Sequence, residues 1–256
     1  MAKARVARGE SYVAGAAALN AMVGAARLSH DVDLFHDTAE AVAESWTVDR
    51  ALLEEHGCEV TPLREREGYV EALVRRDSAS LLLQWTRDSA FRFFPLVEHE
   101  DFGLALHPFD LATNKVLALV GRLEVRDWVD VLTCHERIQP LGYLAWAACG
   151  KDPGFSPQTI IEQAGRATRY SAREVDALSF EGLPPDAGDL ARRWHAMLDQ
   201  ARAVVAVLPP EQAGKCVLDE HATLFSGNAT AAAAARVDGT LRFHEGRIRG
   251  AWPQVR

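Results

Sequence analysis

The sequence lacks paired cysteines, which would mark a disulfide-rich or zinc-binding protein. Its four cysteines, Cys58, Cys134, Cys149 and Cys216, lie far apart and include no C-x-x-C pair. This spacing argues against a disulfide framework and against a cysteine-based zinc site. We expect reduced thiols, most of them buried.

It also lacks an excess of basic residues and a long apolar run. The 28 basic and 36 acidic residues give a formal net charge of -8, so any site for phosphate must be a local one. The alanine-rich stretch near the N-terminus is interrupted by Asn20 and ends at Arg27 and Asp31, which is too short for a signal peptide or a membrane span. We expect a cytoplasmic protein that has no membrane partner.

Two changes of pattern divide the 256 residues into three predicted parts. Residues 1–108 mix strand and helix patterns, residues 109–208 have helical spacing broken by prolines, and residues 209–256 form a small β-containing tail after Pro209 and Pro210. The fold class predicted from these patterns is α+β.

Local signals give the expected elements of each part. Thr38 is expected to cap a helix that runs to about His56 and stops at Gly57. The other elements of the first part are strands over 11–15, 32–35, 58–63, 69–75 and 80–94 and a helix over 16–22. The second part predicts helices over 110–122, 127–134, 140–150, 156–168, 171–178 and 187–208. In the tail we expect a small hairpin-bearing appendage with β-like runs such as 240–244 and 247–252, and a helix over the alanine run 231–235.

The candidate metal ligands are Asp31 and Asp33. Acids at positions i and i+2 of a strand project to the same face, with Cα atoms about 7 Å apart. Two such carboxylates can hold one or two magnesium ions that bridge a triphosphate and neutralise the charge developing on it. An isolated D-x-D pattern is more often a solvated turn, so its context must decide.

The surrounding residues exclude one competing site and suggest a neighbour. An EF-hand loop needs a ligand and a glycine where this chain has Phe35 and His36. The turn at Gly15 and Ala16 opens a helix, so its N–H groups can cradle phosphate. His30 and His36 flank the acids, and we expect hydrated surface histidines rather than metal ligands.

Two motifs in order give a more specific signal than either alone. They are Val13–Ala16 with Arg27-x-Ser29-x-Asp31-x-Asp33, and Leu106–Arg122 followed by Arg126-Asp127-x-x-Asp130. This series resembles the AbiEii/AbiGii-type nucleotidyltransferase toxin family of type IV toxin-antitoxin systems, over about residues 10–135. The resemblance implies a nucleotidyltransferase-like mixed sheet with flanking helices, Mg²⁺ as cofactor, a nucleoside triphosphate as substrate, tRNA as one acceptor and a cognate antitoxin as partner.

The resemblance also implies roles for individual residues. Asp31 and Asp33 match the catalytic metal pair, and Ser29 matches the small hydroxyl residue beside them. Gly15 and Ala16 match the phosphate-holding turn, although Ala16 lacks the hydroxyl that many relatives place there. Lys115 and Arg122 are expected to contact the triphosphate, and a lysine ammonium is a good phosphate partner. Asp127 is expected to be either a catalytic acid or an acid favoured by a helix N-terminus.

One departure bears on catalysis. The place where the family carries a third carboxylate holds Gln84, whose neutral amide cannot take a proton at pH 7. Asp88 shares its face if the strand runs straight, and would then be the substitute general base.

Three functions therefore stay open. They are an active transferase of nucleoside monophosphates, a non-catalytic nucleotide- or protein-binding member of the fold, and a small-molecule nucleotidyltransferase of the aminoglycoside-modifying kind.

Overall fold

The computed structural model describes residues 11–166 and 170–253 and divides into two compact units. The sheet unit comprises residues 1–24, Leu28–Ala90 and Pro95–His107. The helical unit comprises Ala25–Arg27, Phe91–Phe94 and Pro108–Arg256. The predicted parts 109–208 and 209–256 both fall in the helical unit. Residues 167 and 168 of the predicted helix over 156–168 lie outside the described residues.

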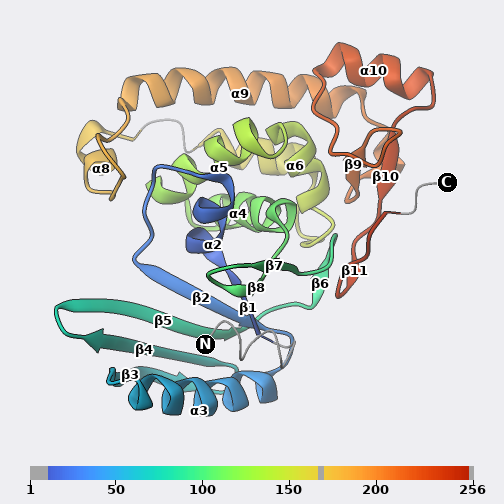
Figure 1. Cartoon of the computed structure of the whole chain (residues 1–256). Coiled ribbons are helices and arrows are strands. Elements are labelled where there is room, and N and C mark those ends of the chain that lie inside the picture. Colours follow the sequence, from blue (N-terminus) through green and yellow to red (C-terminus); the bar gives the residue numbers. More distant parts are fainter. Residues whose placement is uncertain (1–10, 167–169, 254–256) are drawn as a thin grey trace. The chain divides into compact units, whose positions relative to one another are not determined.

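A seven-stranded mixed sheet forms the centre of the sheet unit, in the order β3-β4-β5-β2-β1-β8-β7 (Figure 1). The bounds of its strands are β1 Ser11–Ala14, β2 Asp31–His36, β3 Glu59–Arg66, β4 Tyr69–Arg76, β5 Ala79–Arg87, β7 Val97–His99 and β8 Gly103–Ala105. β3, β4 and β5 form the predicted antiparallel meander, and β5 joins β2 in parallel.

The strand predicted over 80–94 is wrong in its second half. β5 ends at Arg87, and Phe91–Arg92 forms a separate strand, β6, in the helical unit. The chain also adds β7 and β8 to the sheet, which the sequence pattern did not predict. Residues that favour strands occur on both sides of this break, but such a pattern cannot show where a strand changes its partner.

One face of the sheet packs against helix α3 (Ala39–Glu55). Thr38 caps this helix by accepting the N–H of Ala41, as predicted. The indole rings of Trp46 and Trp85 meet edge to face at 4.9 Å between centroids, and Trp85 Nε1 donates to buried Asp49 at 3.0 Å. The buried side chains of β2, β4 and β5 therefore point toward α3.

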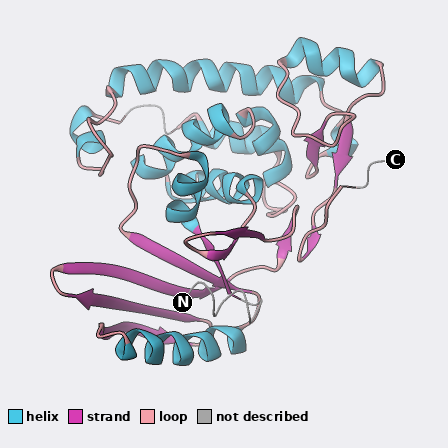
Figure 2. Ribbon diagram, viewed as in Figure 1, coloured by secondary structure: helices cyan, strands magenta, loops and turns pink. Residues whose placement is uncertain are grey.

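Helices dominate the second unit (Figure 2). Their bounds are α4 Pro108–Arg122, α5 Val125–Arg137, α6 Leu141–Ala148, α7 Pro157–Ala164, α8 Ala172–Asp176, α9 Ala187–Val207 and α10 Ala229–Val237, with a 3₁₀ turn at Pro210–Gln212. Helix α6 is buried along its whole length between its neighbours. The helix predicted over the alanine run is present as α10.

The two β-like runs of the tail do not pair with each other. β10 (Arg242–His244) pairs with β9 (Cys216–Leu218), and β11 (Arg247–Ile248) pairs with β6. Gly246 lies between β10 and β11 against the ring of Phe91, where an added Cβ would come within 2.4 Å of ring carbon Cζ. The chain therefore passes over this ring at Gly246, and the next strand, β11, pairs with β6.

Candidate functional site

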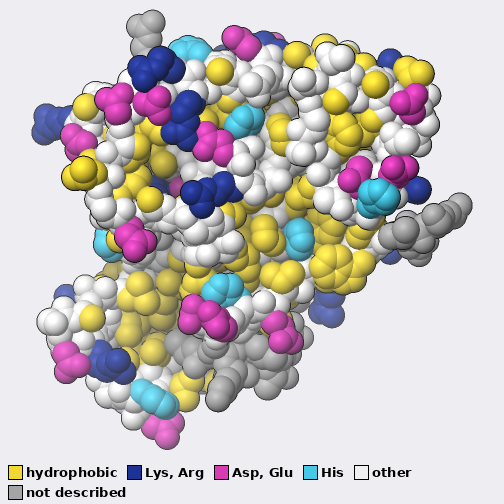
Figure 3. Space-filling model, turned by 45° about the horizontal axis from the view of Figure 1, so that its top comes forward, with side chains coloured by type: hydrophobic (Ala, Val, Ile, Leu, Met, Phe, Trp, Pro, Cys, Tyr) yellow, Lys and Arg dark blue, Asp and Glu magenta, His cyan; other side chains and the backbone are white. Residues whose placement is uncertain are grey.

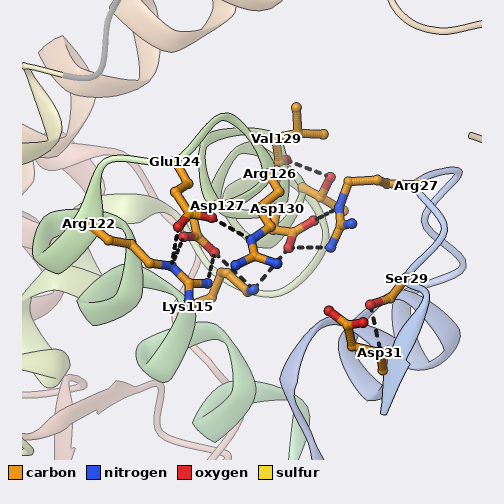
Figure 4. Close-up of polar contacts among 11 residues, drawn as sticks. Arg27, Ser29, Asp31, Lys115, Arg122, Glu124, Arg126, Asp127, Val129 and Asp130 are labelled. Atoms are coloured by element: carbon orange, nitrogen blue, oxygen red, sulfur yellow. Dashed lines mark hydrogen bonds and ion pairs between the residues drawn. The ribbon is translucent and has the colours of Figure 1, made fainter. Parts of the chain in front are cut away.

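The acidic pair lies on β2, on the sheet face opposite α3. Asp31 and Asp33 are both partly exposed, whereas Leu34 and His36, which point the other way, are buried. The hydroxyl of Ser29 donates to the backbone oxygen of Asp31 at 3.2 Å and fixes the chain where β2 begins (Figure 4). The expectation that His36 is a hydrated surface residue is wrong, because its strand position points into the core.

Gly15 lies against the carboxylate of Asp33. Its φ is +67°, a conformation that favours glycine, and an added Cβ would lie 1.8 Å from Asp33 Oδ2. The register of β1 with β2, which sets Ala14 opposite Asp33, produces this close approach. Helix α2 (Gly15–Val23) begins here, and its N-cap residue, Ala14, has no side chain that could cap it. A helix N-terminus beside a candidate metal ligand is suited to phosphate.

Two further polar side chains continue the row that Asp33 begins. Gln84 on β5 pairs directly with Asp33, and Glu71 on β4 pairs directly with Gln84. Directly paired residues share a face, and Gln84 Nε2 donates to Glu71 Oε1 at 3.3 Å. The sequence analysis did not single out Glu71. Tyr69, Glu71 and Leu73 are spaced two residues apart on β4 and therefore share one face. The register that sets Glu71 beside Gln84 cannot be predicted from this spacing.

Asp88 does not continue this row. It follows the end of β5, and its N–H donates to the backbone oxygen of His36 at 2.9 Å. Four residues of extended strand put its Cα about 13 Å from that of Gln84. β5 thus ends one residue before Asp88, and the role of Asp88 as the substitute base stays a prediction.

The second motif forms a buried ion cluster inside the helical unit (Figure 4). Lys115 on α4 contacts both acids of α5, with Nζ 3.1 Å from Asp127 Oδ1 and 3.0 Å from Asp130 Oδ2. Arg122 adds two hydrogen bonds to Asp127, at 2.6 and 2.9 Å. Arg27 binds Asp130 in the same bidentate way, at 2.6 and 2.8 Å.

Helical spacing explains why these residues meet. Lys115 and Arg122 are seven residues apart on α4, and Asp127 and Asp130 are three apart on α5, so each pair occupies one face. Burial by itself raises the pKa of Asp127, but the hydrogen bond from Arg122 and the charge of Lys115 outweigh it, and the pKa is lowered. Asp127 is therefore an ionised acceptor at neutral pH. The Lys115 side chain is only 8% exposed, against 43% for Arg122.

The donor set of the sheet unit fits Mg²⁺. Among residues 11–166 and 170–253, no three side chains of His, Cys, Asp or Glu gather as a metal-binding group. Magnesium commonly takes one or two protein carboxylates and completes its octahedron with substrate phosphates and water. Asp31 and Asp33 supply such a pair, and the N-terminus of α2 lies beside Asp33.

A hollow lies at the ends of β4 and β5, one step along the strands from the Asp33 row. Tyr69 pairs with Thr86, and the guanidinium of Arg66 stacks over the Tyr69 ring at 4.9 Å. The lining residues are Ala39, Arg66, Glu67, Gly68, Tyr69, Thr86 and Arg87. The hollow thus places two guanidinium groups and the carboxylate of Glu67 beside an aromatic ring. Acidic and basic side chains are likewise mixed on the face that Figure 3 shows.

Comparison with known proteins gives a fold but no sequence family. No protein-family model matches the chain, and no curated protein matches it. A protein from H. pylori, provisionally described as a nucleotidyltransferase in its crystal structure, superposes with a TM-score of 0.51 at 14% identity, covering 79% of this chain and 94% of that one. MenT4, a nucleotidyltransferase toxin from Mycobacterium tuberculosis, covers 79% of this chain and 77% of its own at 16% identity, with a TM-score of 0.43.

The first of these superpositions confirms the predicted fold class, and the AbiEii/AbiGii assignment stays a resemblance of motifs. Within the described ranges, no helix is both long and apolar enough to cross a bilayer. The mixed sheet, the carboxylate pair on β2 and the superposition agree on one conclusion: this chain has the nucleotidyltransferase fold.

Proposed function

We propose that this chain is a magnesium-dependent nucleotidyltransferase that transfers a nucleoside monophosphate from a nucleoside triphosphate to an acceptor hydroxyl. The observation that carries the proposal is the close approach of Gly15 to Asp33, which sets the N-terminus of α2 beside a carboxylate pair. Phosphate and a divalent cation are the ligands that these two features bind.

In the proposed reaction the acceptor hydroxyl gives up its proton to solvent water, one P–O bond forms and one P–O bond breaks. The acceptor oxygen attacks the α-phosphorus, the bond from that phosphorus to the β-phosphate bridge breaks, and pyrophosphate leaves. Mg²⁺ held by Asp31 and Asp33 would neutralise the charge on the phosphates. The N–H groups at Gly15 and Ala16 hold the triphosphate, and Ser29 keeps the start of β2 in place.

Of the two cations that the motif series assigns to the nucleotide, Arg122 is the more exposed. Nearly half of its side chain is exposed, whereas Lys115 is enclosed by Asp127 and Asp130. We infer that Lys115 and Asp127 act first of all by holding Arg122 in position. An ionised Asp127 with two cationic partners is a poor proton acceptor, so its proposed part in catalysis is indirect.

A nucleic acid such as tRNA is the acceptor that we propose. The hollow at Arg66, Tyr69 and Arg87 has cations for phosphate and a ring on which a base can stack. The same charges disfavour a polycationic aminoglycoside. The toxin-like role, the cognate antitoxin and the cytoplasmic location are proposals that rest on the motif series.

Transfer of label tests the proposal directly. The full chain is incubated with Mg²⁺, total RNA and each of the four nucleoside triphosphates labelled at the α-phosphate. Wild-type protein is expected to label RNA, Asp33→Asn to abolish labelling, and Asp199→Asn, a change in an exposed residue of α9, to leave it intact. Absence of label with all four nucleotides would rule out transfer to RNA.

Gln84 supports a second candidate function, a nucleotide-binding protein without turnover. It occupies the strand position beside Asp33 with a group that takes no proton. Calorimetry separates the two functions: magnesium-dependent triphosphate binding without any labelled product favours the second candidate, and absence of binding excludes both.

A further inference from the structure

Asp33, Gln84 and Glu71 form a row across three neighbouring strands, and their order in this row is fixed by the strand order. Strand order places β5 between β2 and β4, so Gln84 stands between the two carboxylates. Adjacent strands are about 4.8 Å apart, which brings the Gln84 side chain within reach of both neighbours. All three side chains belong to the sheet unit and lie on the face opposite α3.

Glu71 determines which way the Gln84 amide points. An ionised carboxylate can only accept hydrogen bonds, so the amide must present its NH₂ group to Glu71. The hydrogen bond from Nε2 to Glu71 Oε1 has this orientation. Because Nε2 faces Glu71, the carbonyl oxygen Oε1 of Gln84 is the amide atom that remains for a second partner.

We propose that Gln84 Oε1 is a third, neutral oxygen ligand for the divalent cation of Asp31 and Asp33, and that Glu71 is the positioning residue that holds it so. The inference rests on the proposed function. Amide oxygens are accepted ligands of hard cations. A set of two carboxylates and one amide carries one negative charge less than three carboxylates. The cation therefore binds weakly to the protein alone and arrives with the triphosphate.

Calorimetry with Mn²⁺ and the α,β-methylene analogue of each of the four nucleotides measures this site without turnover. Because it adds a charge to the ligand set at constant size, Gln84→Glu is expected to tighten Mn²⁺ binding in the absence of nucleotide. Gln84→Leu removes the oxygen and is expected to weaken the Mn²⁺-nucleotide complex about tenfold, and Glu71→Gln to weaken it by a smaller factor. The control is Glu59→Gln, a change in an exposed residue of β3 that pairs with Arg75.

A double-mutant cycle isolates the positioning role. If Glu71 acts by orienting the amide, Glu71→Gln has no further effect in the Gln84→Leu background. An equal effect in both backgrounds means that Glu71 acts through its charge alone, and this outcome overturns the positioning role. Circular dichroism and thermal unfolding of each variant confirm that it is folded.

The two proposals fail in different ways. If the wild-type chain binds no Mn²⁺-nucleotide, the proposed function fails. If it binds, and Asp33→Asn abolishes binding while Gln84→Glu and Gln84→Leu match the wild type, the amide ligand alone is overturned.

Discussion

At the scale of single residues, Gly15 connects backbone conformation to chemistry. Its positive φ lets β1 turn directly into α2, and its missing side chain makes room for the carboxylate of Asp33. Any other residue would meet both a strained backbone and a clash with a proposed metal ligand.

Replacing Gly15 by alanine is expected to lower the free energy of unfolding by about 2 kcal/mol or more, because the left-handed conformation alone costs 1–3 kcal/mol. It is also expected to abolish Mn²⁺-nucleotide binding, since Asp33 must move. Urea unfolding and calorimetry measure the two effects. The control is Gly239→Ala, which has φ +68° but open space around the new Cβ. Equal stability of the two variants, with binding retained, would contradict the expectation.

The burial of the Lys115 side chain indicates that this residue has a structural role. It is enclosed between two buried acids, so Lys115→Met leaves Asp127 and Asp130 with one cation fewer in a desolvated site. We expect a loss of about 3 kcal/mol in the free energy of unfolding. The matched change Arg202→Met removes an exposed ion pair with Asp199 and should cost less than about 1 kcal/mol. Similar midpoints in chemical denaturation would refute the distinction.

At the scale of elements, helices α5 and α6 share a cap. Helix α6 has no capping side chain of its own at its N-cap, and the N–H of Leu141 instead donates to Nδ1 of His135, at the end of α5, at 3.0 Å. The ring nitrogen must be unprotonated to accept this bond. Burial also lowers the pKa of His135 from its ordinary value.

This cap predicts a dependence of stability on pH. Because the folded-state pKa of His135 lies below the unfolded value of about 6.5, the unfolded chain binds more protons as the pH falls below that value, and stability is lost. The slope for one proton cannot exceed about 1.4 kcal/mol per pH unit. Urea unfolding between pH 7.5 and 5 should show a smaller loss for His135→Gln than for the wild type. The exposed control His221→Gln should keep the wild-type slope, and identical slopes for all three proteins would contradict the role of His135.

At the scale of the whole molecule, the helical unit is built from three separate segments of the chain. The segment Ala25–Arg27 brings the guanidinium that binds Asp130, and Phe91–Phe94 brings two N–H groups that bind the buried carboxylate of Asp110 at 2.9 and 3.0 Å. The helical unit thus takes polar partners from parts of the chain that lie outside its long C-terminal segment.

A fragment of residues 108–256 is therefore expected not to fold cooperatively. It would bury Asp130 without Arg27, and Asp110 without its backbone donors, and each such loss costs about 1–3 kcal/mol. Circular dichroism against temperature is the measurement. The control is the full chain with Arg27→Met, which loses only the first partner and should unfold cooperatively at a lower temperature. Cooperative unfolding of the fragment at the wild-type temperature would refute this.

Local chemistry determined what the sequence alone could predict. Thr38 and Gly57 bound α3, the glycine after β1 marks the turn, the helical spacing of 108–207 gives the helices, and the acids at i and i+2 share a face of β2. Each of these features depends on residues within one turn or one strand of each other. Over such short stretches the spacing in the sequence determines the distance in space.

The tertiary structure decided which segments meet. It set Gln84 between Asp33 and Glu71, paired β11 with β6 instead of β10, and joined Arg27 to Asp130 across 103 positions of the chain. Strand register and long-range ion pairs depend on packing of the whole unit, which no local pattern records. The acids of the candidate site could therefore be predicted from the sequence, whereas their partners are determined by the tertiary structure.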